Sequence, residues 1–310
     1  MGKTMALTSA RKKIIIEEQG LRDGLQTLPV AVPTEKKLEW ITALVEAGLQ
    51  RIQVGAFVHP QRVPQMADAE ELFRRAHPRP GVAYSALVLN QRGVERALAA
   101  GVRHLAVSIS ASNTHSLKNT RMDIAAAKAD FVKTIRIARE NGIVVRGGIQ
   151  CAFGCRYEGA IPREQVYDLV QHHLDAGVEE LALADSTGMA NPWQIREMSD
   201  TILGMCGTIP LALHLHNTEN KGLANVYAAV EAGVRHFDTA FGGLGGCPFI
   251  EGATGNIATE DTVHMLHQAG FETGVDLVKV ARISAEVASW LGYPLPGAVY
   301  ALAVDGRHMN

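Results

Sequence analysis

Short apolar runs alternate with longer amphipathic segments along almost the whole chain. The runs have the length and the β-branched content of buried strands, whereas the longer segments repeat apolar residues at helical spacing. We predict strands at residues 13–17, 51–54, 83–88, 105–109, 144–150, 180–184, 211–216 and 236–240.

Helices are predicted between these strands, at residues 34–47, 63–75, 92–100, 124–141, 163–176, 192–203 and 222–232. Thr34 is the expected N-cap of the first helix. Several helices end in an Ala-Gly pair, and the glycine can adopt the left-handed conformation that ends a helix. This alternation predicts an α/β protein, a closed (β/α)8 TIM barrel, over residues 1–275.

A doubly wound open sheet is the main alternative to the barrel. Against it, the first strand is not followed by the G-x-G-x-x-G turn of a dinucleotide-binding fold. A further helix at residues 276–290 and a tail rich in Pro and Gly predict a short C-terminal helical extension. We expect residues 276–310 to lie over the barrel mouth as part of the same domain.

Composition narrows the class of partner. The chain has 310 residues, of which 47% are hydrophobic and 20% charged, with a mean hydropathy of +0.03, as in soluble globular proteins. A net charge of −2 argues against a nucleic-acid partner. No stretch approaches the roughly 20 apolar residues of a membrane span, so no membrane partner is expected. Only local basic residues can then recognise an anionic ligand.

The cysteines and the N-terminus point to a cytoplasmic protein. The four cysteines lack a paired framework, so free thiols in a reducing compartment are expected. The first 13 residues contain basic residues and no acids, as transit peptides do. Because this segment is short, we expect a solvated leader instead.

A pair of histidines in the seventh strand is the first candidate for chemistry. Side chains alternate along a strand, so His214 and His216 share one face while Leu213 and Leu215 enter an apolar layer. Two adjacent imidazoles form a two-point metal clamp. Taken alone, the pair is equally compatible with an ordinary, partly exposed strand end.

Reactive groups at other strand ends strengthen the metal hypothesis. Arg22 and Asp23 follow the first strand, where a carboxylate can bind a cation and a guanidinium can donate to an oxyanion. A glycine-rich loop after the eighth strand carries Cys247, and Asn256 follows it. One carboxylate, two imidazoles and one amide are compatible with a six-coordinate divalent cation such as Mg²⁺ or Mn²⁺.

Several motifs together resemble the hydroxymethylglutaryl-CoA lyase family. They are Gly20-Leu-Arg-Asp-Gly-Leu-Gln26, Phe57-Val-His-Pro60, Val63-Pro-Gln-Met-Ala-Asp68, Gly154-Cys-Arg-Tyr-Glu-Gly159, His214-Leu-His216 and Gly242-Gly-Leu-Gly-Gly-Cys-Pro248 through Asn256. The resemblance covers nearly the whole chain. It implies a metal-dependent barrel, expected to be a homodimer, that cleaves hydroxymethylglutaryl-CoA or a similar 3-hydroxyacyl-CoA to acetyl-CoA and a keto acid such as acetoacetate.

The resemblance also implies a role for each candidate residue. The cation is assigned to Asp23, His214, His216 and Asn256; catalysis to Arg22, Cys247, His214 and Asp185; and the pocket and the CoA-contacting edge to Gln26, Lys118 and Asn119. In this scheme Arg22 stabilises an enolate and Cys247 is a mobile-loop thiol. His214, or a group acting through Asp185, accepts the proton of the substrate hydroxyl.

Three positions depart from the family pattern. Gln53 and Asn217 replace the usual acids, and Leu21 replaces a proline. Amides can form hydrogen bonds but cannot act as bases or offset a cation's charge. Because the metal ligands are intact, we expect bond cleavage to be retained. The acyl group of the substrate is left open, and citramalyl-CoA is one alternative to hydroxymethylglutaryl-CoA. A condensing synthase or a decarboxylase on the same barrel, and a ligand-binding protein without turnover, are the other hypotheses.

Overall fold

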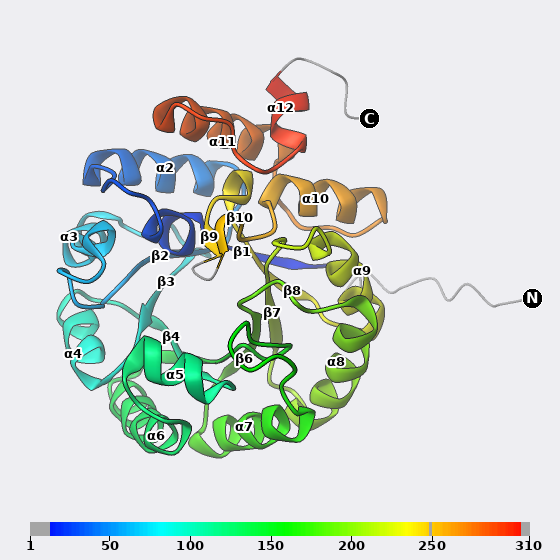
Figure 1. Cartoon of the computed structure of the whole chain (residues 1–310). Helices are drawn as coiled ribbons and strands as arrows, with labels where there is room; N and C mark the ends of the chain where they lie inside the picture. The colour runs from blue at the N-terminus through cyan, green and yellow to red at the C-terminus, as the bar shows by residue number, and fades with distance from the viewer. Residues whose placement is uncertain (1–12, 248–249, 305–310) are drawn as a thin grey trace, which may run out of the picture.

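The computed structural model describes residues 13–247 and 250–304, with side chains described for 13–246 and 255–302. Eight parallel strands close into a barrel in sequence order (Figure 1). They are β1 (Ile15–Glu18), β2 (Arg51–Ala56), β3 (Ala83–Val88), β4 (His104–Ser110), β5 (Val144–Gln150), β6 (Glu180–Asp185), β7 (Leu211–Leu215) and β8 (His236–Thr239). β8 pairs with β1 from Ile15 opposite His236 to Glu18 opposite Thr239, which confirms the closed barrel over the open sheet.

Helices surround the barrel on the outside (Figure 1). They are α2 (Thr34–Glu46), α3 (Ala69–Arg75), α4 (Gln91–Ala99), α6 (Ile124–Glu140), α7 (Arg163–Ala176), α8 (Pro192–Cys206), α9 (Gly222–Ala232) and α10 (Thr259–Gln268). Outside this set are α5 (Asn113–Thr120), α11 (Leu277–Leu291) and α12 (Val299–Val304). A short antiparallel pair, β9 (Gly246–Cys247) and β10 (Ile250–Thr254), follows β8.

The helix ends follow local chemistry. Gly177 and Gly233 end α7 and α9 in the left-handed conformation, with φ of 82° and 106°. Asp123 and Asn191 cap α6 and α8 by accepting hydrogen bonds from backbone N–H groups of the first turn. The prediction for Thr34 was wrong: it is the first residue of α2, and its hydroxyl donates to Asp68 instead of capping the helix.

Two segments differ from the predicted helices. The helix expected at 63–75 is interrupted: a 3-10 turn, η2 (Pro64–Met66), precedes α3. The break comes after Met66, and α3 begins only after Asp68, whose carboxylate accepts hydrogen bonds from Thr34 and Lys37 of α2. α5 was not predicted, because its polar sequence has little helical periodicity; Ser112 caps it by accepting from the N–H of His115.

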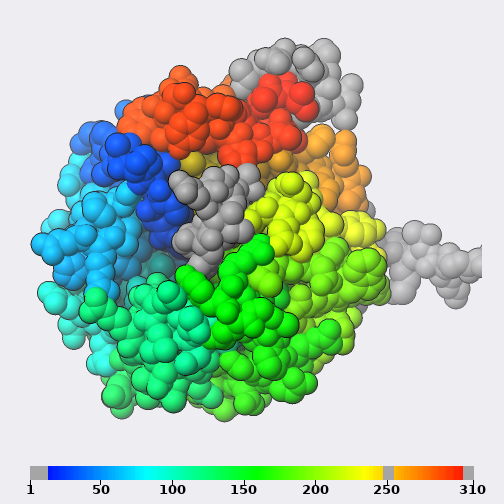
Figure 2. Space-filling model, in the orientation of Figure 1, coloured from blue at the N-terminus to red at the C-terminus, as the bar shows by residue number. Residues whose placement is uncertain are grey.

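The C-terminal helices join the barrel through aromatic packing. The ring of Trp40 on α2 meets the edges of Trp290 on α11 and Phe241 after β8, each with centroids 6.1 Å apart. α11 and α12 lie along one rim of the face shown in Figure 2. The tail reaches the edge of the mouth, where the N–H of Gly297 donates to the carbonyl of Gly242 at 2.8 Å. These contacts support treating the extension as part of the barrel domain.

Within the described part of the chain, no helix combines the length and the apolar character needed to cross a bilayer. Cys151, Cys155 and Cys206 are buried free thiols, as predicted.

Replacing Trp40 tests the attachment of the C-terminal helices. Trp40 is 1% exposed, so Trp40→Ala should lower the free energy of unfolding by about 3–5 kcal/mol in urea denaturation. Trp193→Ala is the matched control, because Trp193 is 81% exposed and its loss should change stability by less than about 0.5 kcal/mol. Equal effects of the two substitutions would contradict this account of the packing.

Candidate active site

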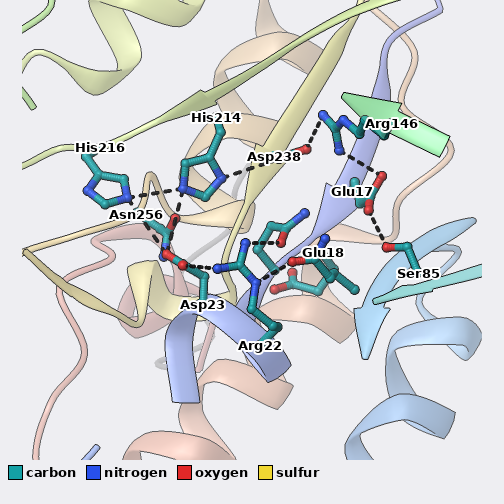
Figure 3. A network of polar contacts seen from close by, with 12 residues as sticks. Glu17, Glu18, Arg22, Asp23, Ser85, Arg146, His214, His216, Asp238 and Asn256 are labelled. Atoms are coloured by element: carbon teal, nitrogen blue, oxygen red, sulfur yellow. Dashed lines mark hydrogen bonds and ion pairs between the residues drawn. The ribbon is translucent and has the colours of Figure 1, made fainter. Parts of the chain in front are cut away.

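The predicted carboxylate and the two imidazoles meet at the C-terminal ends of the strands. β1 leads into a single π-helical turn, η1 (Gly20–Gly24), which directs Asp23 toward β7 (Figure 3). Oδ2 of Asp23 lies 3.7 Å from Nε2 of His214 and 3.8 Å from Nε2 of His216. The two Nε2 atoms are 3.1 Å apart. One ligand atom from each residue therefore lies within 4.8 Å of the others, close enough for one ion to bridge.

Asn256 completes the predicted ligand set. Its backbone forms an isolated β-bridge with that of His216. Its side-chain Nδ2 donates to Oδ2 of Asp23 at 2.9 Å and to the carbonyl of Leu244 at 3.1 Å. Its Oδ1 is buried and has no hydrogen-bond partner among the described residues. A buried amide oxygen without a donor, beside a carboxylate and two imidazoles, is what a divalent cation would satisfy. The residues present therefore fit the implied cation.

A row of buried charged side chains orients the imidazole of His214 on the side away from the candidate metal position. Nδ1 of His214 is 3.3 Å from Oδ2 of Asp238 on β8. Because an ionised carboxylate only accepts hydrogen bonds, Nδ1 carries the hydrogen and Nε2 keeps its lone pair for a metal. Asp238 is held in turn by Arg146 at 2.8 Å, and Arg146 contacts Glu17 at 3.1 Å (Figure 3). Asp238 and Arg146 are not among the site residues expected from the sequence.

Neighbouring positive charges keep the carboxylates of Asp23 and Asp238 ionised. Burial raises the pKa of Asp23, but Arg22 and the imidazoles of His216 and His214 outweigh it and hold the pKa well below its usual range. Burial likewise opposes ionisation of Asp238, and Arg146 together with His214 lowers its pKa. Two anions therefore flank the imidazoles at neutral pH.

Arg22 faces the same cavity with limited exposure. Its Nε donates to Oε1 of Gln53, one terminal nitrogen pairs with Asp23, and the other donates to Oε1 of Gln19 at 3.2 Å. Gln26 donates to Oδ1 of Asp23 at 2.9 Å and also lines the cavity. Because Gln53 is neutral, Asp23 is the one anion hydrogen-bonded to this guanidinium among the described residues.

The cavity has a volume of about 390 Å³ and opens at the barrel mouth. Its lining includes Arg22, Asp23, His214 and His216 at one side and residues of β4, β5 and β6 at the other. Asn119 of α5 also lines it, whereas Lys118 lies with its Nζ 4.8 Å from the ring of Tyr157. The structure thus brings Asn119 to the cavity, and the role of Lys118 stays a prediction.

Asp185 is not brought to the cavity. Its neighbours Ala184 and Ser186 line the cavity, and side chains alternate along a strand, so Asp185 faces the other side of β6. Its carboxylate accepts from the backbone N–H groups of Met189 at 3.0 Å and Ala190 at 3.2 Å. Burial raises its pKa to about 6. Asp185 therefore holds the loop after β6, and the imidazole of His216 opposes the rise in its pKa; its catalytic role stays a prediction.

The glycine-rich segment after β8 approaches the ligand set closely. Gly245 has φ of +131°, and a Cβ there would lie 2.6 Å from Nδ2 of Asn256, so only glycine fits. Gly246 lines the cavity, and the backbone of Cys247 belongs to β9. The side chain of Cys247 lies outside the described residues, as do residues 248 and 249.

The two amide replacements differ in position. Gln53 contacts Arg22 in the cavity, whereas Oδ1 of Asn217 accepts from the N–H of Gly222 at the start of α9. Gln53 is therefore the replacement that alters the cavity itself. Leu21 is fully buried in η1.

A closed (β/α)8 barrel with this donor set at its strand ends defines a metal-dependent barrel enzyme. The HMGL-like family model matches residues 13–287, and the chain belongs to the HMGL-like family. The chain is 39% identical over 285 residues to the hydroxymethylglutaryl-CoA lyase YngG of Bacillus subtilis, covering 92% of this chain and 95% of that protein. It is also 39% identical over 296 residues to the (R)-citramalyl-CoA lyase of Chloroflexus aurantiacus, covering 92% and 93%.

Solved structures agree with the sequence relatives. An HMG-CoA lyase from Acinetobacter baumannii, in complex with coenzyme A and 3-methylmalate, matches with a TM-score of 0.92 and 39% identity, covering 97% of this chain and 98% of that chain. The relatives are lyases, and the family depends on a divalent metal ion.

Asp238→Asn tests the hydrogen bond behind His214. An amide can present its NH₂ group to Nδ1 and so favour the wrong tautomer, and we expect Mn²⁺ affinity to fall by about 10–100-fold in calorimetric titration. Asp200→Asn is the matched control, because Asp200 lies on the exposed surface of α8, and its Mn²⁺ affinity should match wild type. Wild-type affinity in Asp238→Asn would show that Asp238 does not orient the imidazole.

Proposed function

We propose that the chain is a divalent-metal-dependent carbon–carbon lyase. It cleaves a 3-hydroxy-3-substituted acyl-CoA, of the hydroxymethylglutaryl-CoA kind, to acetyl-CoA and a keto acid such as acetoacetate. The observation that carries this proposal is the convergence of Arg22 with Asp23, His214 and His216 in one cavity. The names of the two relatives and the coenzyme A complex support an acyl-CoA substrate.

Asp23, His214, His216 and Asn256 are the residues that hold the cation, which we propose to be Mg²⁺ or Mn²⁺. A divalent cation at this position supplies Lewis-acid polarisation of the substrate oxygens and lowers the pKa of a hydroxyl. The four residues leave room for a chelating substrate if the ion takes six ligands.

Arg22 has the position of an oxyanion donor. Cleavage of the bond between the second and third carbons leaves an enolate on the thioester fragment, with negative charge on its oxygen. A guanidinium preorganised by Gln53 and Asp23 stabilises that charge as it develops, so its contribution falls on kcat more than on substrate binding.

Cleavage also requires a residue in the same cavity that accepts the proton of the substrate's 3-hydroxyl group. The family resemblance implies His214, or a group acting through Asp185, in this role. The hydrogen bond from His214 leads to Asp238, which lines the cavity, and not to Asp185. We therefore propose that Asp238 accepts the proton, because Nδ1 of His214 already carries a hydrogen and Nε2 is assigned to the cation.

The remaining assignments rest on the resemblance. Cys247 delivers a proton to the enolate carbon, while Gln26, Lys118 and Asn119 contact the pocket and the CoA edge. A homodimer in the cytoplasm stays a prediction.

Citramalyl-CoA is the second candidate substrate, because its lyase is as similar to this chain as the hydroxymethylglutaryl-CoA lyase of Bacillus subtilis. Incubation of the Mn²⁺-loaded protein with each thioester, followed by chromatography of acetyl-CoA, distinguishes them. Release of free CoA from acetyl-CoA plus a keto acid would instead indicate a condensing synthase. Bound metal without cleavage of any thioester would indicate a ligand-binding protein.

Arg22→Gln should lower kcat by about 10²-fold or more, because it removes the charged donor at the enolate oxygen. Folding and Mn²⁺ content should be retained, as checked by circular dichroism and elemental analysis. Arg79→Gln is the matched control, since Arg79 is a surface residue paired with Glu46, and its kcat should equal wild type. Near-wild-type turnover of Arg22→Gln would refute the assigned role.

Cys247→Ala should reduce kcat while leaving KM little changed, because the thiol is assigned to proton delivery and not to binding. Cys206→Ala provides a matched loss of a buried thiol on α8 and should retain wild-type kcat. If steady-state kinetics give the same kcat for Cys247→Ala as for wild type, the thiol is not part of the reaction.

A further inference from the structure

Gln53 is the neutral residue that contacts Arg22 from β2. It is 2% exposed and belongs to the cavity lining, and its Oε1 accepts a hydrogen bond from Nε of Arg22. A guanidinium has donors and no acceptor, so the carboxamide of Gln53 has to present its oxygen to Arg22 and turn its Nε2 away. The orientation of this amide is therefore set by its charged partner.

Nε2 of Gln53 is a donor without a protein partner. Among the described residues it makes no hydrogen bond. Nε2 of Gln19 is sealed inside the protein, whereas Nε2 of Gln53 stays accessible, and the accessible side of Gln53 is the cavity that it lines. Buried polar groups nearly always have a hydrogen-bond partner. The partner of this donor therefore belongs to whatever occupies the cavity.

Arg22 has donors left for the same occupant. Its N–H groups donate to Gln53, Asp23 and Gln19, and a guanidinium has more N–H groups than these three contacts use. Arg22 and Gln53 line one cavity, and Nε2 is bonded to the same amide carbon as the oxygen that contacts Arg22. A ligand oxygen that Arg22 binds from the cavity is therefore within reach of Nε2 as well.

The charges around this pair of residues favour a negative oxygen. Gln53 and Gln19 are neutral, and neither offsets the charge of Arg22. The family pattern has an acid at the position of Gln53. A carboxylate there would accept from Arg22 equally well, but it could not donate and would repel an anion. The amide thus supplies a donor where an acid would supply a charge of the wrong sign.

We infer that Gln53 is a further catalytic residue, whose Nε2 donates to the oxygen of the thioester enolate beside the guanidinium of Arg22. The inference rests on the proposed function and adds a second donor to the same site. When the bond between the second and third carbons breaks, its electron pair moves onto the thioester fragment, and negative charge develops on this oxygen. Two preorganised donors stabilise that charge better than one, so the gain falls on kcat more than on substrate binding.

Gln53→Glu tests the donor directly, because it removes Nε2 and keeps an acceptor for Arg22. The loss of one oxyanion donor typically costs about 10²–10³-fold in kcat, so we expect a fall of about 10²-fold or more with KM little changed. Gln53→Met removes the donor without adding a charge, should the buried carboxylate prevent folding, and should lower kcat by about tenfold or more. Wild-type kcat in either folded variant would overturn the inference.

Gln19→Glu separates the lost donor from the added charge. Gln19 also accepts from Arg22, at 3.2 Å, but its Nε2 is sealed inside the protein. This variant adds the same charge beside Arg22 and leaves Nε2 of Gln53 in place, so its loss of kcat should be smaller than that of Gln53→Glu by at least about tenfold. Equal losses in the two variants would assign the effect to charge alone and overturn the inference.

The matched controls are Gln268→Glu and Gln268→Met. Gln268 is exposed at the end of α10, outside the cavity lining, and both variants should keep the wild-type kcat.

Equilibrium binding distinguishes a failure of this inference from a failure of the proposed function. S-carboxymethyl-CoA places a carboxylate close to the position of the enolate oxygen, and S-isobutyl-CoA is its neutral counterpart of similar shape. In calorimetric titration of the Mn²⁺-loaded protein, Gln53→Met should weaken binding of S-carboxymethyl-CoA by about tenfold or more, because a hydrogen bond to a charged group is lost. Binding of S-isobutyl-CoA should match wild type.

The titration gives a result even without turnover. If no thioester is cleaved, the proposed function fails, and a selective loss of S-carboxymethyl-CoA affinity still supports Gln53 as a donor to an anionic oxygen. An equal effect of Gln53→Met on both analogues, or no effect on either, would overturn the inference.

Discussion

The buried carboxylate of Asp23 is the group on which the rest of the site depends. An ionised carboxylate is stable away from water only when charges and donors surround it. Here they come from η1 and the residues just after it, through Arg22 and Gln26, and from distant parts of the chain, through Asn256, His214 and His216. The barrel has to close in register before these partners meet, so the same closure that completes the fold also completes the metal site.

The meeting of Asp23 with His214 and His216 could be predicted because two local rules suffice for it. Alternation along a strand places His214 and His216 on one face, and parallel strands in a barrel all end on the same side, which brings Asp23 to them. No knowledge of the intervening chain is required. The glycine-rich segment was also recognisable, although only the structure explains Gly245, through the closeness of Asn256.

The residues that were missed depend on partners far away in the sequence. Asp238 and Arg146 are single charged residues inside strands, and nothing next to them indicates that they pair with each other or with His214. The π-helical turn that aims Asp23 is likewise a product of tertiary contacts. The role of Asp185 stays a prediction: the family motif suggested it, and the structure brings its neighbours Ala184 and Ser186 to the cavity lining.

Two kinds of position inside the barrel differ in how freely they can change during evolution. Glu17 accepts hydrogen bonds from Ser85, Arg51 and Arg146, and Arg51 also pairs with Glu180. Replacing one charged member would leave a buried charge of another without its partner. Substitutions at these positions therefore have to occur together. Ala106, Ala182 and Ala184 of β4 and β6 line the same cavity and carry no charge, so a change at one of them leaves no ion pair broken. Descendants of one ancestor can therefore reshape this cavity wall while the ion-binding chemistry is inherited unaltered.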